Sequence, residues 1–244
     1  MISLDATFDG EVELWHTLLD LAERAPHWTL IGARMVELHA AEAGRTILRA
    51  SLDGDVLADA RVRPNAVRRI AQILADEDFV LQEPSYMGVG HAFVKGGVEI
   101  DLLAPEHLGT RSEGARTTVE GAHTVEVPGG RQALARTASV RVRVGGREGG
   151  LPRPDLLGAI LLKARAVDVD DVPDSQRSDL ALLLSLVADP DALVEQFRGQ
   201  ERQWLDRRRE MDDAAVPAWR GLTPDDVQRG LAALRQMAGW APRR

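Results

Sequence analysis

The stretch Ser51-Leu52-Asp53-Gly54-Asp55-Val56-Leu57 holds the pattern on which the fold and the site of this chain depend. Successive side chains of a β-strand point to opposite faces of the sheet, so Asp53 and Asp55 are predicted to share one face. The apolar pair Val56-Leu57 follows directly, as in a strand that runs along a core. The sequence therefore predicts a strand that presents two carboxylates on one side.

A second acidic strand is predicted in Val98-Glu99-Ile100-Asp101-Leu102. The Gly96-Gly97 step before it is a two-residue hairpin signal, so this segment reads as the return strand of a hairpin. Its apolar residues alternate with Glu99 and Asp101, which places both acids on the face away from the core. If the two acidic strands are neighbours, three carboxylates converge. Such hard oxygen ligands suit Mg²⁺ and can hold two metal ions around a transferring phosphoryl or nucleotidyl group.

The alternative for these acids is a set of solvated side chains on a turn. Asp-x-Asp is common in this chain, so the motif alone has little specificity. The first copy is distinguished by the apolar residues after it and by the later hairpin with an acid on its alternate face. The other copies lie at 76/78, 168/170 and 189/191.

A junction between a strand and a helix is the second candidate. The apolar run 28–31 is followed by Gly32 and by a predicted helix over 33–43. The free N–H groups at a helix N-terminus bind phosphate well, and glycine lets a ligand approach the backbone closely. Gly32 and Ala33 are therefore candidate phosphate-binding residues. Such junctions are frequent, and an ordinary chain connection is the alternative.

Lys163 interrupts an otherwise apolar helix predicted over 156–167. A lysine in that position either extends its ammonium group to solvent or meets an anion. Asp179, just before another apolar helix, caps that helix or reaches Lys163 if the two helices pack antiparallel. His91 precedes Asp101 on the hairpin and could line the same site, although a core or surface role is the commoner outcome for a lone histidine.

Composition narrows the function classes. The chain has 244 residues, 44% of them hydrophobic and 28% charged, with a net charge of −8. The acidic balance argues against a broad basic surface that grips nucleic acid, although a local arginine-lined groove is compatible with it. No cysteine is present, which excludes disulfides and thiolate chemistry. The N-terminus does not resemble a signal peptide, and no apolar run approaches the roughly 20 residues of a membrane span, so we expect a cytoplasmic protein without membrane association.

The order of patterns predicts an α+β protein in two parts. Residues 1–145 mix strands and helices, the glycine-rich stretch 145–154 is linker-like, and residues 151–244 read as helical. Strands are expected at 28–31, 47–49, 53–62, 80–81, 91–95, 98–103, 123–127 and 137–144. Helices are expected at 10–25, 33–43, 64–75, 132–136, 156–167, 179–187, 190–209 and 223–237.

Taken in order, these pieces resemble the nucleotidyltransferase superfamily that includes DNA polymerase β, and more narrowly its AbiEii/MenT-type members, many of which are toxins of toxin–antitoxin pairs. That family has a strand–glycine–helix junction, an Arg-x-Thr-x-Asp-x-Asp motif, a later strand with a third carboxylate, and a helical part with a lysine and a Lys/Arg-x-x-Asp-Leu signature. The matches here are Leu30-Ile31-Gly32-Ala33, Arg49-Ala50-Ser51-Leu52-Asp53-Gly54-Asp55, Asp101, Lys163 and Arg177-Ser178-Asp179-Leu180.

The resemblance implies a mixed β-sheet flanked by helices and followed by a helical C-terminal part. It also implies a Mg²⁺-dependent nucleotidyltransferase that moves a nucleotide from a nucleoside triphosphate to a hydroxyl acceptor. The acceptor is an RNA 3′ end (for example of tRNA), a protein hydroxyl or a small molecule, and an antitoxin protein is a partner. By this resemblance the metal ligands are Asp53, Asp55 and Asp101, and the nucleotide-binding residues are Gly32, Ala33, Ser51, Lys163 and Asp179.

Two departures from the family pattern keep other functions open. Ala33 stands where the family has glycine or a small polar residue, and Ser178 stands where a lysine would precede Asp179. A catalytically silent member that binds a nucleotide or a protein is therefore the first alternative. A plain α/β interaction protein, whose acids are only surface charge, is the second.

Overall fold

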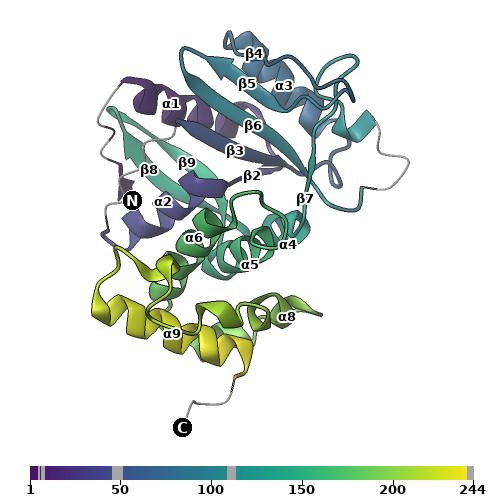
Figure 1. Cartoon of the computed structure of the whole chain (residues 1–244). Helices are drawn as coiled ribbons and strands as arrows, with labels where there is room; N and C mark the ends of the chain where they lie inside the picture. The colour runs from purple at the N-terminus through teal and green to yellow at the C-terminus, as the bar shows by residue number, and fades with distance from the viewer. Residues whose placement is uncertain (5, 7–8, 46–51, 109–113, 241–244) are drawn as a thin grey trace. The chain divides into compact units, whose positions relative to one another are not determined.

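The structure is a computed structural model and describes residues 1–4, 6, 9–45, 52–108 and 114–240. It divides into two compact units, residues 1–155 and 156–244 (Figure 1). We call them the N-terminal unit and the C-terminal unit and describe each by itself. The N-terminal unit combines helices with β-sheets, whereas the described part of the C-terminal unit contains helices and their connections. The α+β class expected from the sequence is confirmed.

The larger sheet of the N-terminal unit is mixed. Its strand β3 runs parallel to β6, while β2 is antiparallel to β3 and β5 is antiparallel to β6. This arrangement makes the two acidic strands direct neighbours at the centre of the sheet. In order, the strands are β2 (Trp28–Ile31), β3 (Asp53–Ala58), β6 (Val98–Pro105), β5 (Ala92–Lys95) and β4 (Val80–Leu81), with β7 (Glu126–Val127) paired to β6.

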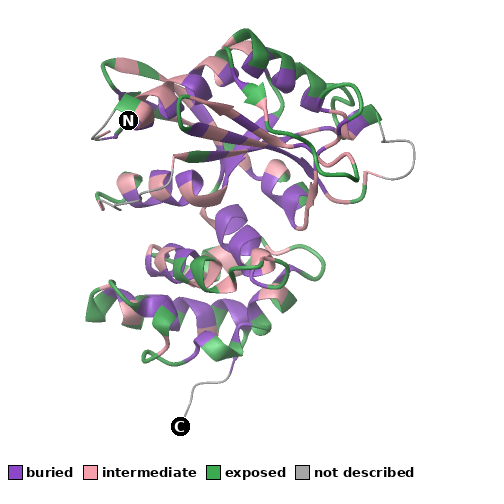
Figure 2. Cartoon of the chain, turned by 45° about the horizontal axis from the view of Figure 1, so that its top comes forward, coloured by how far each residue is buried: buried purple, intermediate pink, exposed green. Residues whose placement is uncertain are grey.

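The hairpin between β5 and β6 forms as the sequence predicts. Gly96 and Gly97 have φ angles of +57° and +89°, and positive φ at both central residues is what a tight hairpin turn requires. Along β6, the apolar residues Val98, Ile100 and Leu102 are fully buried. Glu99 and Asp101, which alternate with them, are only partly buried, so the two faces of the strand differ as expected. Figure 2 shows buried and partly buried residues mixed along the strands of this unit.

Helices pack on the β-sheets of this unit. The longest of them in the N-terminal unit, α1, buries Leu14, Leu18 and Leu21, which lie three or four residues apart on one face. The predicted boundaries of all four helices described in this unit agree with the structure to within two residues. The helices of this unit are α1 (Asp9–Arg24), α2 (Gly32–Glu42), α3 (Ala66–Asp76) and α4 (Gly130–Ala135).

The linker predicted over 145–154 is wrong. Gly145 and Gly146, with φ of +53° and +79°, form the turn of a hairpin. Its second arm, β9 (Arg147–Pro154), pairs with β8 (Thr137–Val144), which also pairs with β1 (Ile2–Ser3). A Cβ atom at Gly149 would lie 2.6 Å from a methyl group of Leu19 in α1. Its missing side chain therefore reflects close packing, which glycine-rich composition alone does not distinguish from flexibility.

A buried polar cluster attaches α2 to the hairpin. His39 of α2 is hydrogen-bonded to the carbonyl oxygen of Pro154 at 3.1 Å. It also contacts the guanidinium group of Arg153, which in turn bonds to Glu42. Burial, together with the positive charge of Arg153, lowers the pKa of His39 to about 3. His39 therefore holds the helix as a neutral imidazole, which is the core role that a lone histidine usually has.

The C-terminal unit is built of shorter helices than the sequence predicts. The helix expected over 190–209 is wrong, because the chain breaks after α7 and resumes at α8, with Gly199 at φ +53° between them. The helix expected over 179–187 begins earlier, at Pro173, where a proline in the first turn is well tolerated. The helices are α5 (Leu156–Ala166), α6 (Pro173–Ser185), α7 (Pro190–Val194), α8 (Glu201–Asp206) and α9 (Pro224–Ala238).

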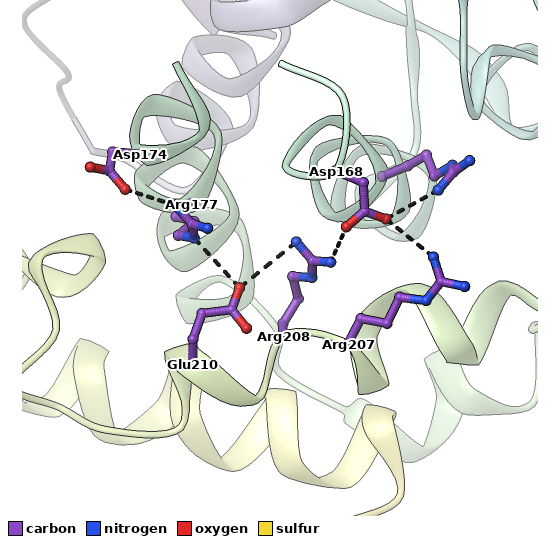
Figure 3. A network of polar contacts seen from close by, with 7 residues as sticks. Asp168, Asp174, Arg177, Arg207, Arg208 and Glu210 are labelled. Atoms are coloured by element: carbon purple, nitrogen blue, oxygen red, sulfur yellow. Dashed lines mark hydrogen bonds and ion pairs between the residues drawn. The ribbon is translucent and has the colours of Figure 1, made fainter. Parts of the chain in front are cut away.

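Asp168, in the loop before α6, anchors a network of ion pairs (Figure 3). Its carboxylate contacts Arg165 at 3.1 Å, Arg207 at 3.5 Å and also Arg208. Burial acts to raise the pKa of Asp168, but the hydrogen bonds and charges of Arg208 and Arg165 outweigh it and hold the pKa below its ordinary value. Glu210 extends the network through Arg208. The acidic loop is thus tied to the segment that follows α8.

None of the helices in the described part of the chain is long and apolar enough to cross a membrane.

Candidate active site

The strand register brings the predicted acids onto neighbouring strands. In the parallel pairing of β3 with β6, Asp55 lies opposite Asp101 and Asp53 lies opposite Glu99. Adjacent strands are about 4.8 Å apart, and residues i and i+2 share a face. Four carboxylates therefore occupy one face of two adjacent strands. We call these residues, Asp53, Asp55, Glu99 and Asp101, the acid cluster.

Gly32 lies directly against the acid cluster. The antiparallel pairing of β2 with β3 places Ile31 opposite Asp55, and α2 begins at the next residue. A Cβ atom at Gly32 would lie 1.8 Å from Oδ2 of Asp55. Gly32 also has φ +67°, a conformation that side-chain-bearing residues rarely adopt. Only glycine allows the carboxylate to come this close to the first residue of the helix.

No side chain from the cap position or the first turn of α2 satisfies the N–H groups at its N-terminus. Its N-cap residue is Ile31, which provides no side-chain hydrogen bond, and no acidic residue stands in the first turn. The backbone N–H groups of such a first turn favour anions, and Gly32 and Ala33 supply the first two. The strand–glycine–helix junction predicted from the sequence is therefore present, with the acid cluster beside it.

Arg34 fixes the first turn of α2. Its side chain is buried and forms ion pairs with Glu37 at 2.6 Å and with Glu11 of α1 at 3.1 Å. Its guanidinium carbon lies 5.6 Å from the ring centre of Trp15, within the range of a cation–π contact. This buried arginine is not among the site residues predicted from the sequence. The available signal was an arginine among apolar residues on the buried side of an amphipathic helix.

Asp101 is the most perturbed member of the acid cluster. Burial raises its pKa, and the negative charges of Asp55, Glu99 and Asp53 raise it further, to about 7. Its Oδ1 atom is buried and has no hydrogen-bond partner in the described part of the chain. The nearest cationic candidate is His91, whose Nε2 lies 3.9 Å from that oxygen. His91, which the sequence placed on the same hairpin, therefore does border the acid cluster.

The acid cluster fits a divalent cation in donor type and in charge. Its ligands are carboxylate oxygens, which hard cations such as Mg²⁺ prefer. The buried acceptor on Asp101 and the mutual repulsion that raises its pKa both leave room for positive charge. Among the described side chains, no group of three histidine, aspartate or glutamate residues is gathered tightly enough to hold a metal ion as it stands.

Lys163 and Asp179 form an ion pair within the C-terminal unit. Lys163 Nζ lies 2.8 Å from Asp179 Oδ2 and donates to Gln176 Oε1 at 2.8 Å. Both charged side chains are buried, with 5% and 8% exposure. Of the two outcomes that the sequence left open for Lys163, it therefore meets an anion and does not extend to solvent. Their predicted contact with a nucleotide stays a prediction. Ser51, the remaining predicted nucleotide-binding residue, lies outside the described residues.

Comparison with known structures identifies the fold. A crystal structure described as an antigenic nucleotidyltransferase-like protein from Paracoccidioides brasiliensis superimposes with a TM-score of 0.52, covering 93% of this chain and 94% of that chain at 11% sequence identity. The fold is nucleotidyltransferase-like. No protein-family model matches the sequence, and no curated protein matches it. The structural similarity agrees with the resemblance to the superfamily. It gives no support to the narrower resemblance to AbiEii/MenT-type proteins.

We predict that Gly32→Ala disrupts the junction. The new methyl group would collide with the Asp55 carboxylate, so the variant should lose free energy of unfolding and move the acid away from α2. Gly44→Ala is the matched control, because Gly44 also has a positive φ (+71°) but open space around its Cβ position. The control should cost about 1–2 kcal/mol from backbone strain alone. Equal losses in chemical denaturation of the two variants would contradict the close approach.

The raised pKa of Asp101 predicts a pH dependence of stability without added metal. Between the ordinary aspartate pKa of about 3.9 and the folded value, the folded chain binds one more proton than the unfolded chain. The contribution of Asp101 is therefore complete below that window and is lost as the pH rises through about 7. Asp101→Asn should gain free energy of unfolding relative to the wild type from pH 5 to pH 8 in EDTA. A constant difference across that range would contradict the assignment.

The Lys163–Asp179 pair predicts strong coupling in the C-terminal unit. Removing one partner leaves a buried charge, so Lys163→Met or Asp179→Leu should lower the free energy of unfolding by about 3–5 kcal/mol. The double variant should lose less than the sum of the two, as measured by a urea double-mutant cycle. The exposed pair of Arg24 and Asp76, also at 2.8 Å, is the control. Its coupling should stay below about 1 kcal/mol, and equal couplings would show that burial is unimportant.

Proposed function

We propose that the protein is a Mg²⁺-dependent nucleotidyltransferase that moves a nucleotide from a nucleoside triphosphate to a hydroxyl acceptor. The observation that supports it most is the position of Asp55, opposite Asp101 on the neighbouring strand and in contact distance of Gly32 at the start of α2. This arrangement places carboxylates that can bind cations beside a helix N-terminus that can bind phosphates. The nucleotidyltransferase-like fold supports the same reaction class.

In this proposal, Asp53, Asp55 and Asp101 hold two Mg²⁺ ions. Bound Mg²⁺ neutralises the charge of the triphosphate and makes the acceptor hydroxyl easier to deprotonate. Gly32 and Ala33 donate their backbone N–H groups to the phosphates. Because α2 is held by Arg34 and by the His39 cluster, these donors are fixed before the substrate arrives.

Asp101 has a further role in the proposed reaction. Its Oδ1 is a buried acceptor without a hydrogen-bond partner among the described groups, so it is suited to receive the proton of the attacking hydroxyl. The oxygen of that hydroxyl forms a bond to the α-phosphorus of the triphosphate, and pyrophosphate leaves. Its leaving charge is stabilised at the N-terminus of α2.

The finer parts of the proposal come from the resemblance. Ser51, Lys163 and Asp179 complete the nucleotide site, an RNA 3′ end such as that of tRNA is the acceptor, and an antitoxin is a protein partner in the cytoplasm. Of these residues, Lys163 and Asp179 form an ion pair with each other within the C-terminal unit. In this proposal they shape the nucleotide site and do not contribute an uncompensated charge to it.

A catalytically silent protein that binds a nucleotide is the second candidate. Two observations favour it: the described acids are not gathered tightly around a single metal position, and Lys163 is engaged in an ion pair. This candidate gives nucleotide binding without turnover. Calorimetry with each nucleoside triphosphate and Mg²⁺, followed by analysis of the same samples for pyrophosphate, separates it from the enzyme.

The proposed activity predicts that Asp55→Asn abolishes nucleotide transfer. Incubation with labelled nucleoside triphosphates, Mg²⁺ and total RNA should label an acceptor with the wild type. The variant should be slower by roughly a hundredfold or more, because a lost metal ligand removes several kcal/mol of charge stabilisation. Asp78→Asn is the matched control, since Asp78 belongs to another Asp-x-Asp pair and its left-handed backbone (φ +65°) tolerates asparagine. Equal labelling by all three proteins would refute the enzyme.

A further inference from the structure

A surface pocket of about 300 Å³ lies in the N-terminal unit. This volume is at the lower end of the range for small-ligand sites. Three of its residues have little or no side chain, so backbone groups reach the cavity, and two others are basic side chains. The lining consists of Gly114, Arg116, Thr117, Gly121, Ala122 and His123.

The guanidinium group of Arg116 is the candidate anion-binding group of the pocket. Its Nε atom is buried and has no hydrogen-bond partner in the described residues. The nearest carboxylate oxygen recorded for it is Oε1 of Glu126, at 3.9 Å, which is too far for a hydrogen bond. The other oxygen of Glu126 accepts the backbone N–H of His107 at 2.9 Å, which holds that carboxylate away. The Arg116 side chain as a whole is 30% exposed and lines the pocket, so the remaining guanidinium N–H groups are available for charge-assisted hydrogen bonds to an oxyanion there.

The pocket is joined to the acid cluster by one loop, residues 82–91. His123 donates its backbone N–H to Gly88 at 2.8 Å and accepts from Gly90 at 2.9 Å. At the end of the same loop, His91 accepts the backbone N–H of Leu102 at 2.9 Å, next to Asp101. The wall of the pocket and the edge of the acid cluster are therefore parts of one hydrogen-bonded segment.

The loop also presents an unusual aromatic side chain. Tyr86 is the one tyrosine of the chain and is 99% exposed. It lies at the tip of a turn that the backbone bond from Gly88 N–H to the Ser85 carbonyl closes at 2.8 Å. That turn packs on the pocket, since a Cβ atom at Gly88 would lie 3.2 Å from the carbonyl oxygen of Gly121. A ring this exposed is available to a planar ligand.

We propose that this pocket binds a phosphate group of the acceptor and that Tyr86 stacks on a base of the same nucleotide-containing molecule. The inference rests on the proposed function, because it assigns the pocket to the molecule that receives the nucleotide. Arg116 forms the charge-assisted hydrogen bonds, with the imidazole of His123 beside it. In a chain of net charge −8, binding here depends on this local site and on stacking, which tolerates every base.

The test is binding of a fluorescein-labelled, single-stranded RNA of eight nucleotides to the full chain, measured by anisotropy in EDTA without nucleoside triphosphate. Arg116→Gln should weaken binding roughly three- to tenfold and reduce the slope of log K against log salt concentration by about 1. Tyr86→Ala should weaken binding roughly five- to a hundredfold, whereas Tyr86→Phe, which keeps the ring, should bind like the wild type.

The control is Arg141→Gln, an exposed arginine on β8 in the other sheet of the same unit. Equal binding by Arg116→Gln and Arg141→Gln, or no effect of Tyr86→Ala, would overturn the inference. So would competition by inorganic phosphate that does not depend on Arg116. Because Tyr86 makes no contact that folding requires, its variants give an answer even if Arg116→Gln unfolds.

The two proposals fail in different ways. Oligonucleotide binding in EDTA does not require turnover, so an inactive protein that still binds RNA through Arg116 and Tyr86 refutes the enzyme alone. Transfer that is lost in Asp55→Asn, combined with RNA binding that ignores Arg116 and Tyr86, refutes the acceptor site alone.

Discussion

The close approach of Asp55 to Gly32 is the constraint on which the N-terminal unit depends. The acid lies on β3, opposite the last residue of β2, and the helix α2 begins at once. A positive φ at Gly32 lets the chain turn from strand to helix without a loop, and the missing Cβ leaves the carboxylate its place. Glycine at position 32 is thus compatible at once with the pairing of β2 and β3, the start of α2 and the position of the Asp55 carboxylate. The α2 anchors at Arg34 and His39 then prevent the helix from moving away.

The acid cluster stores electrostatic repulsion that the rest of the sheet must outweigh. Asp101 has its pKa raised by burial and by three neighbouring carboxylates. The opposite face of the same strands is fully apolar, with Val56 and Leu102 completely buried. Burial on that face and the central pairing of β3 with β6 hold the acids together although they repel. Such a cost at one place in an otherwise consistent fold is typical of a functional site.

Local sequence patterns predicted those parts of the fold that depend on residues close together in the chain. The alternation in β6 and the Gly96-Gly97 turn required only a few residues of sequence. The errors arose where the same composition has two physical meanings. Gly149 was taken as part of a flexible linker, yet it is small because Leu19 packs against it. The amphipathic pattern after residue 190 was extended across Gly199, whose positive φ ends the helical path. The adjacency of β3 and β6 is long-range, and only the resemblance suggested it.

Two described cations are paired within their own units. Lys163 is paired with Asp179 in the C-terminal unit, and Arg34 with Glu11 and Glu37 in the N-terminal unit. Arg34 cannot balance the acid cluster without leaving a buried carboxylate unpaired, which is costly. Among the described residues, His91 approaches the acid cluster, with its Nε2 3.9 Å from Oδ1 of Asp101. A bound cation would supply balancing charge. It would also explain why the sheet keeps four carboxylates on one face, next to the start of α2.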